Sequence, residues 1–401
     1  MLRPIRTPAA VTFNGALLAD HIEAHRQDAD RMAALVARCD KYLAARPIAM
    51  TERRIKAPSG DIHDYASYGP YWWPDPTKPD GVPYIRRDGE FNPESRDPNN
   101  FDAFFTEVLT LAIGALYAPE GKDADYAARA VRDLRVFFLD EQTRVNPHMT
   151  YAQGIPGVCT GRGIGMIDSR NSWQLFDAIG ILDAIGAMPE EVLSGVKRWF
   201  NAFLDWTLTS EIGADEDLQH NNHGTWFDVQ VAATALFLGR RNLAKDRLMS
   251  AYDRRLAKHI MPDGRQPFEL ARTDAPGYSS MNLRAWTLLG KMAKRIGIKT
   301  DYFGQIPTGF NAPPLLCALE YLAPYGADVS DFPYQNIHGG AIDGLIAELS
   351  YLLAPEYPEA ALKDRSEKPD PAFPGEEPSL DRLAGRYDKP EHFYRLLPAG
   401  A

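Results

Sequence analysis

FDAFFTEVLTLAIGALYA, residues 101–118, is the stretch that decides the fold class. Its apolar side chains cover nearly the whole circumference of a helix, and they show no strand-like alternation with polar residues. A helix that is apolar all round must be buried on every side. NSWQLFDAIGILDAIG (171–186) and HGTWFDVQVAATALFLG (223–239) have the same character. The sequence therefore predicts a core built from buried helices.

Helical patterns continue on both sides of this stretch. Residues 14–46 repeat apolar side chains at helical spacing, which predicts one long amphipathic helix limited by Pro47. Other helical segments, many bounded by Asn, Ser, Pro or Gly, lie at 125–140, 190–210, 241–260, 278–297, 313–325 and 339–354. Strand patterns are almost absent, which predicts an all-α fold of paired helices in layers. Because no fixed-period repeat is visible, an α/α toroid, meaning an incomplete α/α barrel, is favoured over a solenoid.

Two segments depart from the helical pattern. Residues 55–100 are dense in Pro, Gly, Asp and Asn, which predicts a long irregular region over the cleft. A loop of this length is usually functional, so we expect it to bind the substrate. Residues 355–401 are rich in Pro and charge, which predicts a surface tail. We therefore expect one domain over residues 1–354, followed by that tail.

Composition limits the class of function. The hydrophobic fraction of 45% is that of a globular chain, and the formal net charge of -10 argues against nonspecific binding of nucleic acid. Cys39, Cys159 and Cys317 are too scattered for a disulfide framework or a zinc knuckle. No stretch is long enough to span a membrane. MLRPIRTPAAVTFNG (1–15) lacks the apolar segment of a signal peptide, so the protein is either cytoplasmic or has lost a leader.

QHNNHGTWFDVQ, residues 219–230, places two asparagines and a histidine at the start of a helix. Asn221 or Asn222 could cap that helix, whose amide groups and dipole would then favour an anion. The plain alternative is a capped helix with a hydrogen-bonded His223. A metal pair formed by His220 and His223 would need a third ligand, so we expect no metal and no cofactor.

FELARTDAPGYSSMN, residues 268–282, brings Arg272 and Tyr278 into one short loop that leads into a helix. Pro276 and Gly277 fix the turn before the tyrosine, whose side chain could reach into a cleft. The alternative is a tyrosine whose ring packs and whose hydroxyl meets solvent.

Aromatic and basic residues gather in YGPYWWPDPTKPDGVPYIRRDGEFNPE, residues 68–94. Aromatic rings stack on the apolar faces of sugars, and arginines bind carboxylates in a bidentate manner. We expect one of the two tryptophans to fill core. The candidate substrate-binding residues of this segment are Tyr71, Trp72, Trp73, Arg86 and Arg87.

GRGIGMIDSRNSWQLFDA, residues 161–178, joins a glycine-rich loop to a helix. It does not follow a strand and is not a GxGxxG motif, so it predicts no dinucleotide site. Arg170 and Asn171 could face the same cleft as the other motifs.

Taken in order, YGPYWWPDP, PYIRRDGEFNPE, GIGMIDSRNSW, NNHGTWFDVQ and ELARTDAPGYS resemble the alginate lyase superfamily of polysaccharide lyases. They span roughly residues 60–285, and NNHG followed by ELARTxxxxYS looks most like polysaccharide lyase family 38. Family 5 is similar, with one more residue between the arginine and the tyrosine. The resemblance implies an α/α toroid that acts on an acidic polysaccharide, alginate or glucuronan, in the periplasm or after secretion. It also implies four catalytic residues, with Asn221 and Asn171 as alternative asparagines: Asn222, His223, Arg272 and Tyr278.

The implied reaction is β-elimination. Removal of the C5 proton of a uronate places charge on its carboxylate, which Asn222, His223 and Arg272 would neutralise, each worth ~2.7–4 kcal/mol when well placed. In D-mannuronate and D-glucuronate the C5 hydrogen and O4 lie on one side, so Tyr278 could take the proton and return it to O4. A tyrosine has a pKa of ~10, which Arg272 would lower; activity would then rise toward mildly alkaline pH. His223 is the competing base, suited to guluronate.

Two other functions are compatible with the sequence. A glycoside hydrolase on an α/α toroid would need two carboxylic acids in the cleft, for which Asp228 and Glu269 are candidates. A noncatalytic polyuronate-binding protein would need no catalytic residue at all. Product chemistry distinguishes a lyase from a hydrolase, because a lyase leaves a C4–C5 double bond that absorbs ultraviolet light and a hydrolase does not.

Overall fold

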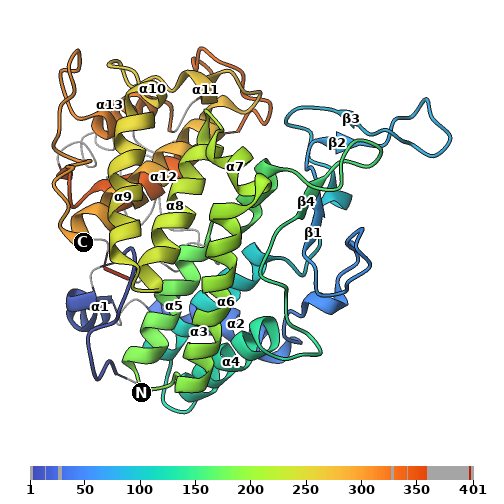
Figure 1. Cartoon of the computed structure of the whole chain (residues 1–401). Coiled ribbons are helices and arrows are strands. Elements are labelled where there is room, and N and C mark those ends of the chain that lie inside the picture. The colour runs from blue at the N-terminus through green and yellow to red at the C-terminus, as the bar shows by residue number, and fades with distance from the viewer. Residues whose placement is uncertain are drawn as a thin grey trace. The chain divides into compact units, whose positions relative to one another are not determined.

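A computed structural model describes residues 3–13, 15–25, 29–326, 329–340, 342–358 and 397–398 (Figure 1). The chain divides into two compact units. The first contains the described residues of Met1–Gln219, Ala233–Arg241 and Asp388–Pro398, and the second those of His220–Ala232, Asn242–Tyr387 and Ala399–Ala401. The single domain over 1–354 stays a prediction. The predicted tail lies mostly outside the described residues.

The first unit is built mainly from helices. Its helices are α1 (Leu18–His25), α2 (Ala29–Ala44), α3 (Phe101–Tyr117), α4 (Lys122–Phe138), α5 (Ser172–Ala184), α6 (Glu190–Thr209) and α7 (Glu211–Asp217), with the short 3-10 helix η4 (Gly163–Ser169) before α5. The segment 14–46, for which the sequence predicts one long helix, contains the described 3-10 helix η1 (Gly15–Leu17) and the helices α1 and α2, and α2 ends before Pro47 as expected. Asn100 caps α3 by accepting the N–H of Ala103 at 3.0 Å.

α3 is the centre of this unit, as its apolar circumference predicts. It packs against α2, α4 and α5 (Figure 1). Phe104 of α3 stacks on Phe137 of α4, with ring centroids 3.9 Å apart. On another side, α2 lies so close that a Cβ at Gly114 would come within 2.5 Å of the Cys39 sulfur. Only a glycine permits that approach.

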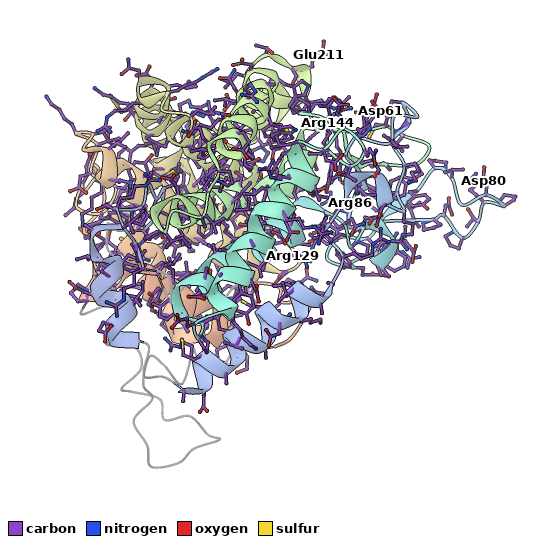
Figure 2. The ribbon with its side chains drawn as sticks, turned by 90° about the horizontal axis from the view of Figure 1, so that it is seen from below. Asp61, Asp80, Arg86, Arg129, Arg144 and Glu211 are labelled. Carbon is purple, nitrogen blue, oxygen red and sulfur yellow. The ribbon has the colours of Figure 1, made fainter. Side chains whose placement is uncertain are left out.

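One buried ion cluster ties three of these helices together. Arg129 of α4 donates to Glu107 of α3 at 2.8 Å and to Asp133 at 2.7 Å, and all three side chains are almost fully buried. Its remaining nitrogen donates to the carbonyls of Tyr42, Leu43 and Ala45 at the end of α2. Figure 2 labels Arg129 among the helices. Burial raises the pKa of Glu107 and of Asp133, and each carboxyl lies beside the other.

The region 55–100 is irregular apart from short elements. β1 (Ala66–Tyr68) pairs in parallel with β4 (Tyr151–Gly154), and β2 (Trp72–Trp73) pairs antiparallel with β3 (Ile85–Arg86). In the second pair Trp72 lies opposite Arg86. The pairing of β1 with β4 therefore connects the long irregular region to the rest of its unit.

The second unit is also helical. Its elements are α8 (Asn222–Phe237, up to Ala232), α9 (Arg241–Ala251), the π-helix η5 (Tyr252–Leu256), α10 (Ala257–His259), α11 (Pro267–Leu270), α12 (Ala275–Ile296), α13 (Pro314–Leu322) and α14 (Asp343–Leu353). α12 packs against α11, α13 and α14, and its Trp286 is fully buried. The helical content of both units confirms the all-α prediction. Among the described helices, none is long and apolar enough to cross a membrane.

Candidate active site

The start of α8 holds the asparagine-histidine motif. Asn221 is the capping residue, because its Oδ1 accepts the backbone N–H of His223 at 3.1 Å. Asn222 is the first residue of α8 and is completely buried. The choice between the two asparagines as helix cap, which the sequence leaves open, is thus resolved in favour of Asn221. Asn222 is left for another role.

Asn222 is held by a buried carboxylate. Its backbone N–H donates to Oε1 of Glu269 and its side-chain Nδ2 donates to Oε2, both at 2.6 Å. Glu269 lies on α11 and is 1% exposed. Burial raises the pKa of Glu269 to about 7, against the lowering effect of the two hydrogen bonds from Asn222 and of the charges of His223 and Arg272. Glu269 therefore lies at the centre of the motif residues of this unit.

Arg272 and Tyr278 are in direct contact. Nη2 of Arg272 donates to the hydroxyl of Tyr278 at 2.9 Å, and its Cζ lies 3.9 Å from the centroid of the tyrosine ring. The turn between them is fixed by Asp274, which accepts the N–H of Gly277 with Oδ1 and that of Tyr278 with its carbonyl. In the second unit Asn222 thus binds Glu269, the charges of His223 and Arg272 act on Glu269, and Arg272 contacts Tyr278.

The predicted substrate-binding residues of the long loop lie in the first unit. Tyr71 precedes the β2–β3 pair, in which Arg86 contacts Asp88 at 2.7 Å; Arg86 is labelled in Figure 2. Arg87 has its Cζ 5.5 Å from the Trp73 ring. Neither Trp72 nor Trp73 is fully buried. The expectation that one of them fills core is therefore wrong, because the two-residue strand on an irregular loop leaves both indoles half-buried.

Arg170 and Asn171 are engaged by their own unit. Asn171 is buried beside the start of α5 and donates to Asp102 of α3 at 2.6 Å. Arg170 donates to the carbonyl of Ile167 at 3.2 Å. The first contact joins the start of α5 to α3 and the second lies within the last turn of η4, and the part of these two residues in substrate binding stays a prediction.

The two carboxylates suggested for a hydrolase are unsuited to that chemistry. Asp228 of α8 is completely buried and forms ion pairs with three arginines, at 2.7 Å from Arg247, 3.1 Å from Arg254 and 2.8 Å from Arg255. Glu269 is equally buried, with both oxygens bound to Asn222. Neither carboxylate is exposed or left without a partner, whereas a hydrolase needs two carboxyl groups available at the glycosidic bond.

The alternative of a metal site at His220 and His223 would need a third ligand. Among the described residues, no three His, Cys, Asp or Glu side chains converge so as to hold a metal ion. The ring of His220 instead packs against Phe268, with centroids 4.8 Å apart.

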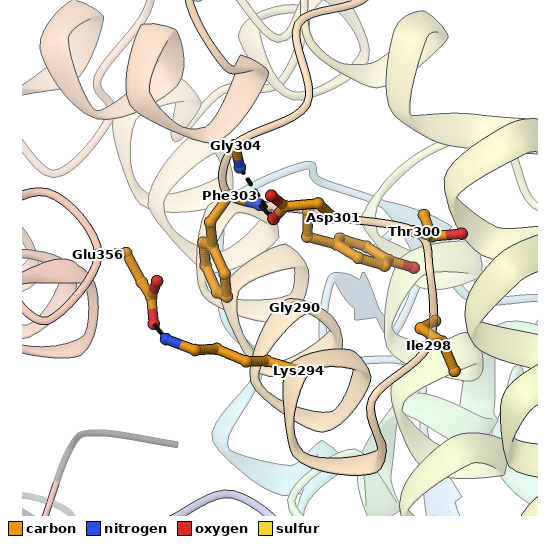
Figure 3. Close-up of a pocket in the computed structure, with 9 residues that line it drawn as sticks. Gly290, Lys294, Ile298, Thr300, Asp301, Phe303, Gly304 and Glu356 are labelled. Atoms are coloured by element: carbon orange, nitrogen blue, oxygen red, sulfur yellow. Dashed lines mark hydrogen bonds and ion pairs between the residues drawn. The ribbon is translucent and has the colours of Figure 1, made fainter.

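A separate cavity of about 450 Å³ lies in the second unit (Figure 3). It is lined by Gly290 and Lys294 near the end of α12. Tyr278 lies in the first turn of the same helix, which places its Cα roughly 18 Å from that of Gly290 along the helix axis. Lys294 is paired with Glu356 at 2.6 Å, and Asp301 adds a further acidic group. A cavity with this charge does not suit a polyanion, and it holds none of the motif residues.

Residues 49–332 match the family model described as alginate lyase. A search of curated proteins finds no match. A solved alginate lyase from Bacteroides ovatus is 35% identical, with a TM-score of 0.80, over 90% of this chain and 97% of that one.

A variant of alginate lyase A1-III bound to a tetrasaccharide is 14% identical, with a TM-score of 0.51, over 88% of this chain and 89% of that one. At that identity the likeness concerns the fold alone. Together these similarities confirm the predicted fold class, all-α of the α/α-toroid type. The family model covers more than half of the chain and the Bacteroides ovatus enzyme covers most of it, so the protein is a polysaccharide lyase that belongs to the alginate lyase family.

Proposed function

We propose that the protein cleaves a β-1,4-linked polyuronate, alginate or glucuronan, by β-elimination, with Tyr278 as base and acid. The observation that carries the proposal is the 2.9 Å hydrogen bond from Arg272 to the Tyr278 hydroxyl, next to the Asn222–Glu269 pair. Alginate is favoured as a substrate because the similar Bacteroides ovatus protein is named an alginate lyase. Membership of family 38 and a periplasmic or secreted location stay predictions.

The reaction begins with neutralisation of the substrate carboxylate. Arg272 and His223, with the amide of Asn222, supply donors where negative charge develops as the C5 proton leaves. Glu269 holds Asn222 by two hydrogen bonds, so little reorganisation of that residue is needed at the moment of reaction.

Proton transfer and bond cleavage follow at Tyr278. The phenolate, favoured by the contact with Arg272, takes the C5 proton, and the electron pair of that bond forms the C4–C5 double bond. The C4–O4 bond breaks, and O4 receives a proton from the phenol. The products are one chain with a 4,5-unsaturated uronate at its nonreducing end and a leaving chain with a new reducing end, with no net gain or loss of electrons.

Guluronate requires a second base, because its C5 hydrogen lies opposite O4. His223 is the candidate, since it follows Asn222 in the first turn of α8 and a neutral imidazole can accept a proton. In that case His223 would take the proton and Tyr278 would protonate O4.

The proposed activity is testable with purified polymers. Mixed separately with polymannuronate, polyguluronate and glucuronan, the protein should raise the ultraviolet absorption of at least one polymer, with or without a chelator. A new reducing end without ultraviolet absorption would contradict elimination and favour hydrolysis. Absence of both signals would contradict the proposed substrate class.

Replacing Glu269 by glutamine should lower kcat/KM by about ten- to a hundredfold, since hydrogen bonds to a charged acceptor contribute ~1.5–3 kcal/mol. One oxygen of the glutamate becomes an N–H group, which cannot accept from Asn222. In the unaltered enzyme kcat/KM should decrease as the pH drops below about 7, because Glu269 then takes up a proton. Steady-state kinetics across pH 5–9 would measure both effects.

The matched control is Glu320→Gln, an exposed glutamate on α13 of the same unit, which should leave kcat/KM unchanged. A Glu269→Gln variant that keeps both the full rate and the acid limb of the profile would refute the role of Glu269 in positioning Asn222.

A further inference from the structure

Arg162 is a cation of the first unit to which the proposed mechanism gives no role. It precedes η4, and both of its hydrogen bonds go to the uncharged oxygens of Gln153, from Nε to the carbonyl at 2.9 Å and from Nη2 to Oε1 at 3.2 Å. Among the residues that the structure describes, none accepts a hydrogen bond from its Nη1. None of their carboxylates forms an ion pair with it. The guanidinium is therefore oriented but not neutralised by direct contact.

Gln153 is itself held firmly in place. It is 6% exposed and has a φ of 48°, a left-handed conformation that non-glycine residues rarely adopt. Its N–H donates to Ser67 at 2.8 Å, and its Nε2 donates to Asp168 at 2.9 Å, which turns Oε1 toward Arg162. Asp168 also accepts from Tyr65 and from Ser67. Strained residues fixed by their surroundings in this way cluster at functional sites.

The surroundings of Arg162 include a second cation and an indole. Burial lowers the pKa of Arg162, nearby Cys159, Asp168 and Glu216 act against that lowering, and the charge of nearby Arg86 adds to it. A Cβ at Gly69 would lie 2.7 Å from Nη2 of Arg162 and 2.5 Å from Cδ1 of Trp72, so the guanidinium and the indole adjoin. Trp72 is also the cross-strand partner of Arg86. Two guanidiniums and one aromatic side chain thus share one place on the first unit.

We propose that Trp72, Arg86 and Arg162 form a subsite for one uronate unit of the polysaccharide. The carboxylate is bound by the two guanidiniums, which relieves their mutual repulsion, and the sugar ring stacks on the indole. This inference deepens the proposed function and rests on it for the identity of the ligand. The sequence points to Trp72 and Arg86 but not to Arg162, which only the fold places beside them.

Binding can be measured without turnover in a Tyr278→Phe background. Isothermal titration with a tetramer of mannuronate, a tetramer of glucuronate and the uncharged tetramer of mannose would compare Arg162→Met with Arg135→Met. Arg135 is a half-exposed arginine of the same unit, paired with Glu191 on the surface. Arg162→Met should raise the Kd for an acidic tetramer at least about tenfold, and Arg162→Lys less than that. Affinity for mannotetraose should stay the same in all variants.

The exposed position of Arg86 provides a second variant that does not depend on folding of the Arg162 variant. Its side chain is 57% exposed, so Arg86→Met should fold normally and should also weaken binding of the acidic tetramers. Acidic-tetramer affinities of Arg162→Met and Arg86→Met that stay within twofold of the Arg135→Met control would overturn the subsite. If Arg162→Met does not fold, the result for Arg86→Met alone decides.

The subsite and the lyase activity can fail separately. Turnover by the unaltered enzyme together with unchanged binding by the variants would leave the lyase standing and remove the subsite. Binding that depends on Arg162 and Arg86, without any unsaturated product from the unaltered enzyme, would retain the subsite and contradict the proposed reaction.

Discussion

Replacing Tyr278 with phenylalanine should reduce kcat on the preferred polyuronate by ~10²- to 10⁴-fold, the usual contribution of a positioned general acid or base. The variant keeps the ring that lies 3.9 Å from the Arg272 guanidinium and loses only the hydroxyl that accepts its hydrogen bond. KM should change little, because the ring and the carboxylate donors remain. The loss of kcat is measured from the initial rate at which ultraviolet absorption by the unsaturated product increases.

The control for this variant is Tyr357→Phe. Tyr357 belongs to the same unit and donates its hydroxyl to the carbonyl of Phe303 at 2.6 Å, away from the motif residues. Both variants lose one phenolic hydrogen bond, so a fall in rate shared by the two would indicate general destabilisation. A Tyr278→Phe enzyme with a kcat within threefold of the unaltered enzyme would eliminate the tyrosine as base and acid.

Replacing Arg129 with methionine should lower the free energy of unfolding by about 3–5 kcal/mol, because it leaves two buried carboxyls without their cation. Three carbonyls at the end of α2 also lose their donor. Urea unfolding followed by circular dichroism measures the loss. The control is Arg135→Met, on the same helix α4, whose ion pair with Glu191 lies on the surface and should matter by less than about 1 kcal/mol.

The loss should grow with pH. Burial raises the folded-state pKa values of Glu107 and Asp133 above those of the unfolded chain, and Arg129 acts against that rise. A carboxyl whose pKa is raised by folding contributes stability below its unfolded pKa, and that contribution is lost as pH rises through the folded pKa. Without Arg129 both pKa values rise further. A difference between variant and unaltered protein that is larger at pH 5 than at pH 8 would contradict this explanation.

The helical core could be predicted from the sequence because its cause is local. The apolar circumference of 101–118 requires burial in any tertiary arrangement, and α3 is the buried centre of its unit. The asparagine-histidine motif could be placed at a helix start for the same reason. Capping depends on residues within one turn, and Asn221 caps α8.

The contacts that set the chemistry could not be predicted because they join distant parts of the chain. Glu269 is 47 residues from Asn222, and nothing in either segment indicates that one holds the other. The enclosure of Asp228 by three arginines and the contact of Arg162 with Gln153 also depend on packing. For Trp72 and Trp73 the sequence led to a wrong prediction, that one indole fills core. Large aromatic residues suggest core when their exposure is unknown.

The close approach of Cys39 to Gly114 has a consequence for shortened forms of the protein. The family match begins at residue 49, which invites a truncation that starts there. Such a chain would lack α2 and expose the side of α3 that α2 covers, around Gly114. We expect it to aggregate during expression, and the boundary for a soluble fragment should be placed before Ala29.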